Sequence, residues 1–158
     1  MKTLQIPKGY EFDRIENGEI ILKKGDILSK INSVEDAIEE LGQKDNEVQN
    51  LKSLYALKRN TNLDCNYLIT YQELVVITKA LNEGWVPDYS DHKQGKYEVW
   101  AGINSAGLLF SHSDYVPSAT IASLGARLCY RDKRTVDHSR KTFENLWFKH
   151  LLEIDNIK

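Results

Sequence analysis

The residues with the most chemical potential lie in one short segment, Leu81–Asp91. It brings an indole, a phenol and two carboxylates close together in the chain, at Trp85, Asp88, Tyr89 and Asp91. Exposed aromatic rings beside carboxylates suit the binding of a cationic or aromatic group. The same residue types also suit a structural role, in which the tryptophan covers the end of a helix and the proline and aspartate fix a turn. We expect the segment to be a helix exit first and a recognition surface second.

No other pattern in the chain specifies a reaction. Asp88 and its neighbours, with His92, lack the spacing of a calcium loop and any second cluster for zinc. His112 lies in a Ser-His-Ser-Asp run, but neighbours on one strand point to opposite faces and do not readily pair. Cys129 and His138 could form a nucleophile and its base, yet no third residue and no glycine-rich turn supports them. We therefore expect no catalytic residue, no metal and no cofactor, and a protein that is not an enzyme.

A second candidate is a basic cluster near the C-terminal end. Residues 127–141 contain six Lys or Arg against two Asp, a local charge of +4. If 124–130 is a strand, alternation places two of these cations on the face that carries the indole of an earlier strand. Such a face can stack bases and hold phosphates, whereas a solvated charged edge that discourages aggregation is the alternative. The candidate nucleic-acid residues are Trp100, Arg127, Arg131, Lys133 and Arg134.

Composition favours one ordinary globular domain over residues 1–158. Apolar residues make up 41% of the 158 and charged residues 28%, and the net charge of −2 excludes a global basic field. Met1–Pro7 has no apolar signal region, and the longest apolar run is far short of the roughly 20 residues that span a bilayer. We expect a soluble, cytoplasmic protein without a membrane partner, in which Cys65 and Cys129 are most simply reduced thiols.

Local signals divide the first half into a hairpin and helices. Asn17-Gly18 supplies the positive φ values of a two-residue turn between strands 11–16 and 19–23. Ser33 resembles an N-cap, Gly42 a helix stop, and Thr70 begins a capping box for a helix that starts there or one turn earlier. The predicted helices cover 34–41, 46–59 and 70–81, the last with Gly84 just after it.

After Gly95 the apolar period changes from 3.6 to 2, which predicts strands at 96–103, 108–116 and 124–130. Asp132 or Thr135 then caps a last helix, with fraying after Glu153. The predicted fold is α+β: a three-stranded antiparallel meander with helices packed on one face, plus an N-terminal β-hairpin and central helices. Its parts are a hairpin segment (1–25), a helical part (33–84) and a part with strands and the C-terminal helix (95–153).

Three segments resemble a family of hypothetical proteins from Bacteroides and their phages or prophages. They are Ile6–Asp13 (IPKGYEFD), Leu81–Ser90 (LNEGWVPDYS) and Arg127–Asp132 (RLCYRD). The order of these segments is also similar, although Tyr89 stands where the family has a tryptophan and the stretch from Ser111 to Ser123 looks longer. The resemblance implies a phage-like, mobile-element accessory protein, and it brings no catalytic residues.

Two functions follow as expectations. The first is a non-enzymatic protein-interaction or self-association module whose surface includes Trp85, Asp88, Tyr89 and Asp91. The alternative is a nucleic-acid-binding accessory protein that uses the basic cluster and an open sheet face.

Overall fold

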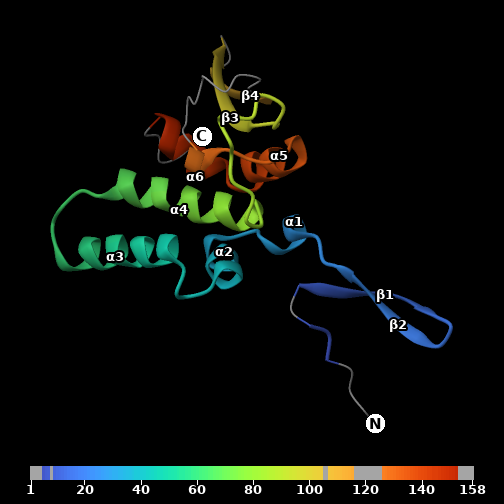
Figure 1. Cartoon of the computed structure of the whole chain (residues 1–158). Coiled ribbons are helices and arrows are strands. Elements are labelled where there is room, and N and C mark those ends of the chain that lie inside the picture. Colours follow the sequence, from blue (N-terminus) through green and yellow to red (C-terminus); the bar gives the residue numbers. More distant parts are fainter. Residues whose placement is uncertain (1–4, 8, 105–106, 116–125, 153–158) are drawn as a thin grey trace.

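The computed structural model describes residues 5–7, 9–104, 107–115 and 126–152 and has an α+β fold (Figure 1). Helices and strands are mixed in sequence; most of the helices gather around one central helix, and the described strands form two separate antiparallel pairs. In chain order the elements are β1 (Tyr10–Glu16), β2 (Glu19–Lys24), α1 (Ile27–Lys30), α2 (Val34–Leu41), α3 (Asn46–Asn60), α4 (Asn66–Leu81), β3 (Tyr97–Asn104), β4 (Gly107–Tyr115), the 3₁₀ helix η1 (Ala126–Leu128), α5 (Lys133–Thr142) and α6 (Glu144–Leu152).

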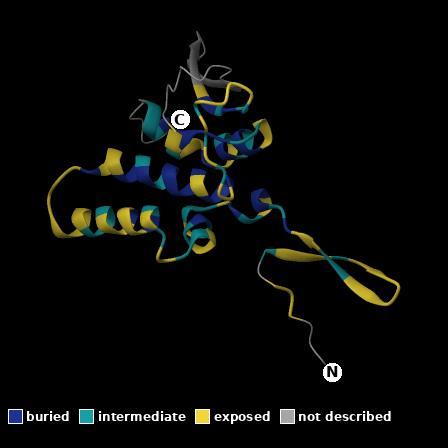
Figure 2. Ribbon diagram, viewed as in Figure 1, coloured by how far each residue is buried: buried dark blue, intermediate teal, exposed yellow. Residues whose placement is uncertain are grey.

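The predicted N-terminal hairpin is confirmed. Asn17 and Gly18 have φ values of 51° and 83°, as the two-residue turn requires, and β1 pairs antiparallel with β2. The hairpin extends away from the helices as an arm, and most of its residues are exposed (Figures 1 and 2). We call residues 10–24 the arm.

Ser33 caps α2 as the sequence predicts, whereas α4 begins without a side-chain cap. The Ser33 hydroxyl accepts a hydrogen bond from the Asp36 amide at 3.0 Å, and Gly42 ends α2 with a φ of 86°. Helix α4 begins one turn before Thr70, which lies buried inside it. The carboxylate expected to close the capping box, Glu73, instead accepts a hydrogen bond from the hydroxyl of a tyrosine on α3 at 2.6 Å.

Helix α4 is the centre of the core. It contacts α2, α3, α5, α6 and η1, and most of its length is buried (Figure 2). Apolar residues on all sides of α4 are therefore buried, which explains why its sequence shows no continuous polar face. The largest fully buried side chains of the core include Leu51, Leu74, Ile77, Leu81, Leu128, Tyr130, Val136 and Trp147.

The predicted third strand is wrong over its described part, 126–130. Ala126–Leu128 is a 3₁₀ helix, and only Tyr130 pairs, through one isolated bridge to Tyr97 with N–O distances of 3.1 and 2.8 Å. Leu128, Cys129 and Tyr130 are consecutive and all fully buried, which a strand with one open face does not allow. In the described residues this sheet is the two-stranded antiparallel ribbon β3–β4, with a lone bridge where the third strand was predicted.

The side chain of Asn82 binds the edge of this segment that faces away from Tyr97. Its amide nitrogen donates to the carbonyl of Cys129 at 2.8 Å, and its oxygen accepts from the amide of Arg131 at 3.2 Å. These are backbone groups that a neighbouring strand would otherwise bind. The C-terminal segment is thus attached to the end of α4.

The last predicted helix is two helices. The Asp132 carboxylate caps α5 by accepting from the Thr135 amide at 2.8 Å. Helix α5 ends at Thr142, Phe143 is its C-cap, and α6 begins at Glu144. Helix α5 contacts both strands of the β3–β4 ribbon. Among the described residues, no helix has the length and apolar character needed to cross a bilayer.

Candidate functional site

The Leu81–Asp91 segment is a helix exit whose carboxylates bind their own loop. The Asp88 carboxylate accepts from the amide of Ser90 at 2.8 Å and from its hydroxyl at 2.6 Å, and these bonds hold the pKa of Asp88 below its usual range. The Asp91 carboxylate accepts from the amide of Lys93 at 2.8 Å. Both carboxylates therefore shape turns, as in the structural alternative.

Tyr89 points toward the protein interior and away from a recognition surface. Burial, together with the neighbouring Cys129, raises the pKa of Tyr89 to about 12. The buried Lys96 ammonium lies 5.6 Å from the Tyr89 ring centroid and donates to the carbonyl of Asp91 at 3.0 Å. The aromatic ring, the cation and the loop backbone therefore stabilise one another.

Cys129 and His138 do not form a catalytic pair. Burial raises the pKa of Cys129 to about 11, so at neutral pH it is a protonated thiol and a poor nucleophile. The Nε2 atom of His138 lies 2.8 Å from the carbonyl oxygen of Ile31, at the end of α1. Cys65 and Cys129 are both free and buried. The side chain of His112 lies outside the described residues.

Trp85 and Arg127, one from each predicted site, line the same hollow. This cavity of about 270 Å³ lies between α3, α4, the loop and η1, and its walls include Val86, Pro87 and Ala126. Its cations already have partners. The Arg127 guanidinium lies 3.5 Å from the Glu47 carboxylate, and Lys79 of α4 lies 2.7 Å from the N-cap carboxylate of α3. The hollow is thus a small apolar groove with paired charges at its rim.

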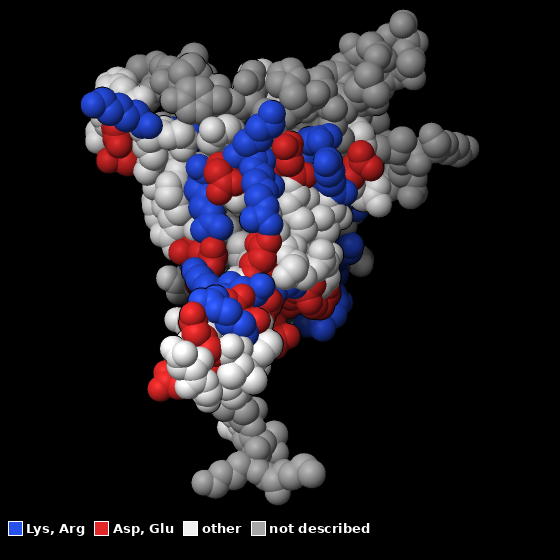
Figure 3. Space-filling model, turned by 90° about the vertical axis from the view of Figure 1, so that its right-hand side faces the viewer, with Lys and Arg blue, Asp and Glu red and all other residues white. Residues whose placement is uncertain are grey.

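The predicted basic face on a third strand is not present in the described residues, because 126–130 does not form that strand. Trp100 is 43% exposed and Val99 is buried, as predicted for β3, but Glu98 is buried as well. Arg131 pairs with Glu83 at 2.7 Å. Arg134 pairs with the N-cap carboxylate of α1, and on the face shown in Figure 3 basic and acidic side chains alternate. Lys133 is exposed at the start of α5.

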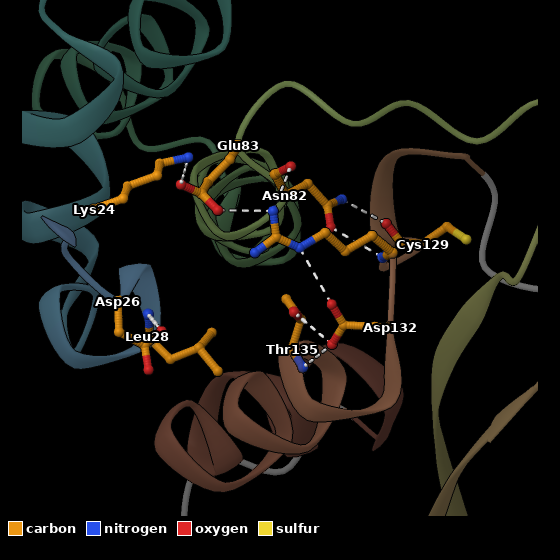
Figure 4. Close-up of polar contacts among 9 residues, drawn as sticks. Lys24, Asp26, Leu28, Asn82, Glu83, Cys129, Asp132 and Thr135 are labelled. Atoms are coloured by element: carbon orange, nitrogen blue, oxygen red, sulfur yellow. Dashed lines mark hydrogen bonds and ion pairs between the residues drawn. The ribbon is translucent and has the colours of Figure 1, made fainter. Parts of the chain in front are cut away.

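A chain of polar contacts connects the arm to the end of α4 and to the start of α5 (Figure 4). The Glu83 carboxylate binds Lys24 of the arm at 2.7 Å through one oxygen and Arg131 at 2.7 Å through the other. The Nε atom of Arg131 lies 3.3 Å from Asp132, the cap of α5. Glu83 itself has a φ of 49°, so the exit of α4 is turned to present this carboxylate. The network fixes the base of the arm on the body.

One face of the arm is an exposed apolar surface that was not among the sites predicted from sequence. A β-bulge between Phe12 and Arg14 adds one residue to β1, so that Phe12 and Ile15 point to the same face despite being three apart. Their cross-strand partners Leu22 and Ile20 share that face, together with Tyr10. Tyr10, Phe12, Ile15 and Ile20 are 51%, 50%, 64% and 44% exposed.

The opposite face of the arm is mostly charged. The pairing places Glu11, Arg14, Glu16, Glu19 and Lys23 on it, with Ile21 as its apolar member. The arm is therefore amphipathic, but its apolar face is directed to solvent rather than to the core. One signal for it exists in the sequence: Ile20-Ile21-Leu22 is an uninterrupted apolar run that a strand with one buried face does not need.

No group of His, Cys, Asp and Glu side chains in the described part of the chain could hold a metal ion. Comparisons with protein-family models, with curated proteins and with solved structures find no match for the chain. The fold and surfaces define a small α+β protein with a projecting amphipathic hairpin.

Proposed function

We propose that the chain is a non-enzymatic interaction module that joins protein chains through the apolar face of its arm. The single observation that carries the proposal is the exposure of Tyr10, Phe12, Ile15 and Ile20 on one face of a hairpin that extends from the body. Contiguous apolar patches of this kind mark interaction sites.

The energetics support an arm that acts in contact with another protein. A two-stranded hairpin is marginally stable alone in water, and burial of apolar surface is worth about 25 cal/mol per Å². A partner that covers the apolar face would supply this stabilisation. The Trp85–Asp91 loop supports the proposal less well, because Asp88 and Asp91 bind their own backbone and Tyr89 is half-buried. A role in a phage-like or mobile element and a cytoplasmic location remain parts of the proposal that rest on the sequence alone.

Photo-cross-linking tests the proposed module. We expect p-benzoylphenylalanine in place of Phe12 to cross-link to a protein when the chain is irradiated in the organism that makes it. The same residue in place of Arg14, on the charged face of the arm, should give several-fold less product. The readout is the mass of the adducts on a denaturing gel and their identification by mass spectrometry. Equal, background-level yields at both positions would remove the arm as an interaction surface.

Nucleic-acid binding is the second candidate, because three cations meet at one surface hollow. Lys133, Arg134 and Lys141 line an open cavity of about 730 Å³ beside α5, together with His138. Cations around such a hollow suit phosphate groups. Asp26 and Asp137 also line it, and Asp26 pairs with Arg134, so the net positive charge is small. Trp100, 43% exposed, would supply a stacking surface.

Salt-dependent binding separates the two functions. On the nucleic-acid proposal, the variant Lys133→Ala with Lys141→Ala should lower the slope of log affinity against log salt for single-stranded DNA by about 1.4, or about 0.7 per lost phosphate contact. Lys52→Ala with Lys58→Ala on α3 is the control of equal charge. A mobility shift at several salt concentrations measures the slopes, and identical slopes for all three proteins would contradict this alternative.

A further inference from the structure

We infer that the free edge of β2 pairs with β2 of a second copy of this chain, in an antiparallel register that places Ile21 opposite Ile21. The inference rests on the proposed function and deepens it. It names the partner as another copy and the contact as a strand edge, which together make a four-stranded sheet from two arms.

The backbone of β2 has hydrogen-bonding groups to offer. The arm is a two-stranded sheet in the described chain, so each of its strands has one free edge. Across a two-residue turn, Glu16 and Glu19 form a hydrogen-bonded pair, and at the other end the Gly25 amide donates to Gly9 at 2.8 Å. Odd-numbered residues of β2 therefore turn their N–H and C=O groups toward β1. Ile20 and Leu22 turn theirs outward, where they can bind another strand.

The edge of β1 is less suited to this role. Its bulge between Phe12 and Arg14 interrupts the regular spacing of backbone groups, which is a common protection of sheet edges. Glu11, Asp13 and Glu16 against Arg14 also give β1 a negative charge, so two copies of β1 would repel each other. β2 has no bulge on its own strand and carries charges of both signs.

The outward groups fix which registers are allowed, and the side chains favour one of them. When Ile20 lies opposite Leu22 of the second copy, Ile21 lies opposite Ile21 and Glu19 lies opposite Lys23. Residues directly opposite each other point to the same face, so apolar side chains meet apolar ones and the carboxylate meets the ammonium. The twofold axis makes the Glu19–Lys23 pair twice.

The two neighbouring registers place apolar side chains opposite charged ones or opposite glycine. A shift in one direction places Ile20 opposite Lys24 and Ile21 opposite Lys23. A shift in the other direction places Glu19 opposite Ile21 and Leu22 opposite Gly18. Among these three registers, only the one centred on Ile21 places Glu19 opposite Lys23, while Lys24 lies opposite Gly18.

The charge distribution within the arm also fits a second copy. Glu19 lies opposite Glu16 across the turn, an unfavourable pairing of like charges, while Arg14 binds Glu16 at 3.0 Å and Asp13 at 2.6 Å. Lys23 of a second copy would bring a cation to Glu19. The twofold axis of such a pair is perpendicular to the sheet, so both apolar faces lie on the same side. The protein contact proposed above is then made by two arms together.

Cysteine cross-linking tests the register in the purified full-length chain. In a non-hydrogen-bonded antiparallel pair the Cα atoms are about 4.5 Å apart, within the range of disulfides. Under mild oxidation, Ile21→Cys should give several-fold more covalent dimer than Ile20→Cys or Leu22→Cys alone. A mixture of the Ile20→Cys and Leu22→Cys chains should give their heterodimer. Cys65 and Cys129 are buried, so the parent chain is the blank.

Charge reversal tests the pairing without a covalent bond. Glu19→Lys should raise the dissociation constant of the dimer by about 3- to 10-fold, because two attractive pairs become repulsive. Within its own arm the new lysine faces Glu16, so the hairpin itself is not weakened. Adding Lys23→Glu should restore the dimer. Sedimentation velocity over a concentration series measures all three proteins.

The outcomes separate this inference from the proposed function. Equal disulfide yields at 20, 21 and 22, with a monomer at all concentrations, would overturn pairing through β2. If the photo-cross-linker at Phe12 still captures a different protein, the interaction module stands and only the second copy is excluded. If Phe12→Cys forms the dimer and Ile21→Cys does not, the two arms meet by their faces and the edge register is wrong. If photo-cross-linking gives no adduct, no cysteine variant gives a covalent dimer and sedimentation shows only monomer, both proposals are wrong.

Discussion

Replacing Asn82 by alanine should lower the free energy of unfolding by about 2–4 kcal/mol. Asn82 is 4% exposed, and its side chain binds the Cys129 carbonyl at 2.8 Å and the Arg131 amide at 3.2 Å. Alanine removes both bonds and leaves a buried acceptor and a half-buried donor without partners. Each such group costs about 1–3 kcal/mol, which is more than the bonds themselves contribute.

Denaturant unfolding of the Asn82→Ala chain measures this loss, with Asn50→Ala as the matched control. Asn50 is exposed on α3 and binds only Glu47 of its own helix, at 3.3 Å, so its removal should change stability by less than about 0.5 kcal/mol. Asn82→Asp keeps the shape and the acceptor but cannot donate to Cys129, and it should also destabilise. A loss for Asn82→Ala no larger than that of the control would show that the two segments do not depend on this contact.

The part of the fold that sequence predicted is the part that neighbouring residues decide. The Asn17-Gly18 turn, the Ser33 cap and the stop at Gly42 each depend on residues within four positions, and all three are present. The third strand failed for the opposite reason. Ala126–Leu128 is a 3₁₀ helix, and the next two residues are buried against elements distant in sequence, such as Asn82, which lies 47 positions from Cys129. No local pattern carries that information.

The candidate sites also show what a local sequence pattern can and cannot predict. Proximity in sequence grouped Trp85, Asp88, Tyr89 and Asp91, but an irregular loop has no period that fixes side-chain direction. The two carboxylates therefore turn to their own backbone while the phenol turns inward. In the arm, a period of two places Phe12 and Ile15 on opposite faces, and only the bulge brings them together. The one extra residue in β1 therefore places Phe12 and Ile15 on one apolar face, which a regular period of two does not predict.

Ser139→Ala should cost about 2–3 kcal/mol of stability, because this serine is the polar centre of the core. Its hydroxyl oxygen lies 2.7 Å from the Tyr130 hydroxyl and accepts from the indole N–H of Trp147 at 3.1 Å. The Tyr130 hydroxyl also accepts from Thr78 of α4 at 2.8 Å. These contacts join α4, α5, α6 and the segment after η1, and Tyr130, Ser139 and Trp147 are fully buried.

Alanine at 139 preserves almost all of the packing, so the loss it causes measures the hydrogen bonds rather than a cavity. Ser53→Ala is the control, since that serine is exposed on α3 and donates only within its helix, to Gln49 at 2.9 Å. Because Tyr130 and Ser139 share one bond, Tyr130→Phe with Ser139→Ala should cost less than the sum of the single changes, by about 0.5–1 kcal/mol. Strict additivity in denaturant unfolding would mean that the two hydroxyls contribute independently. Tyr130 would then stabilise the core through its bond with Thr78, and Ser139 through its bond with Trp147, without support from each other.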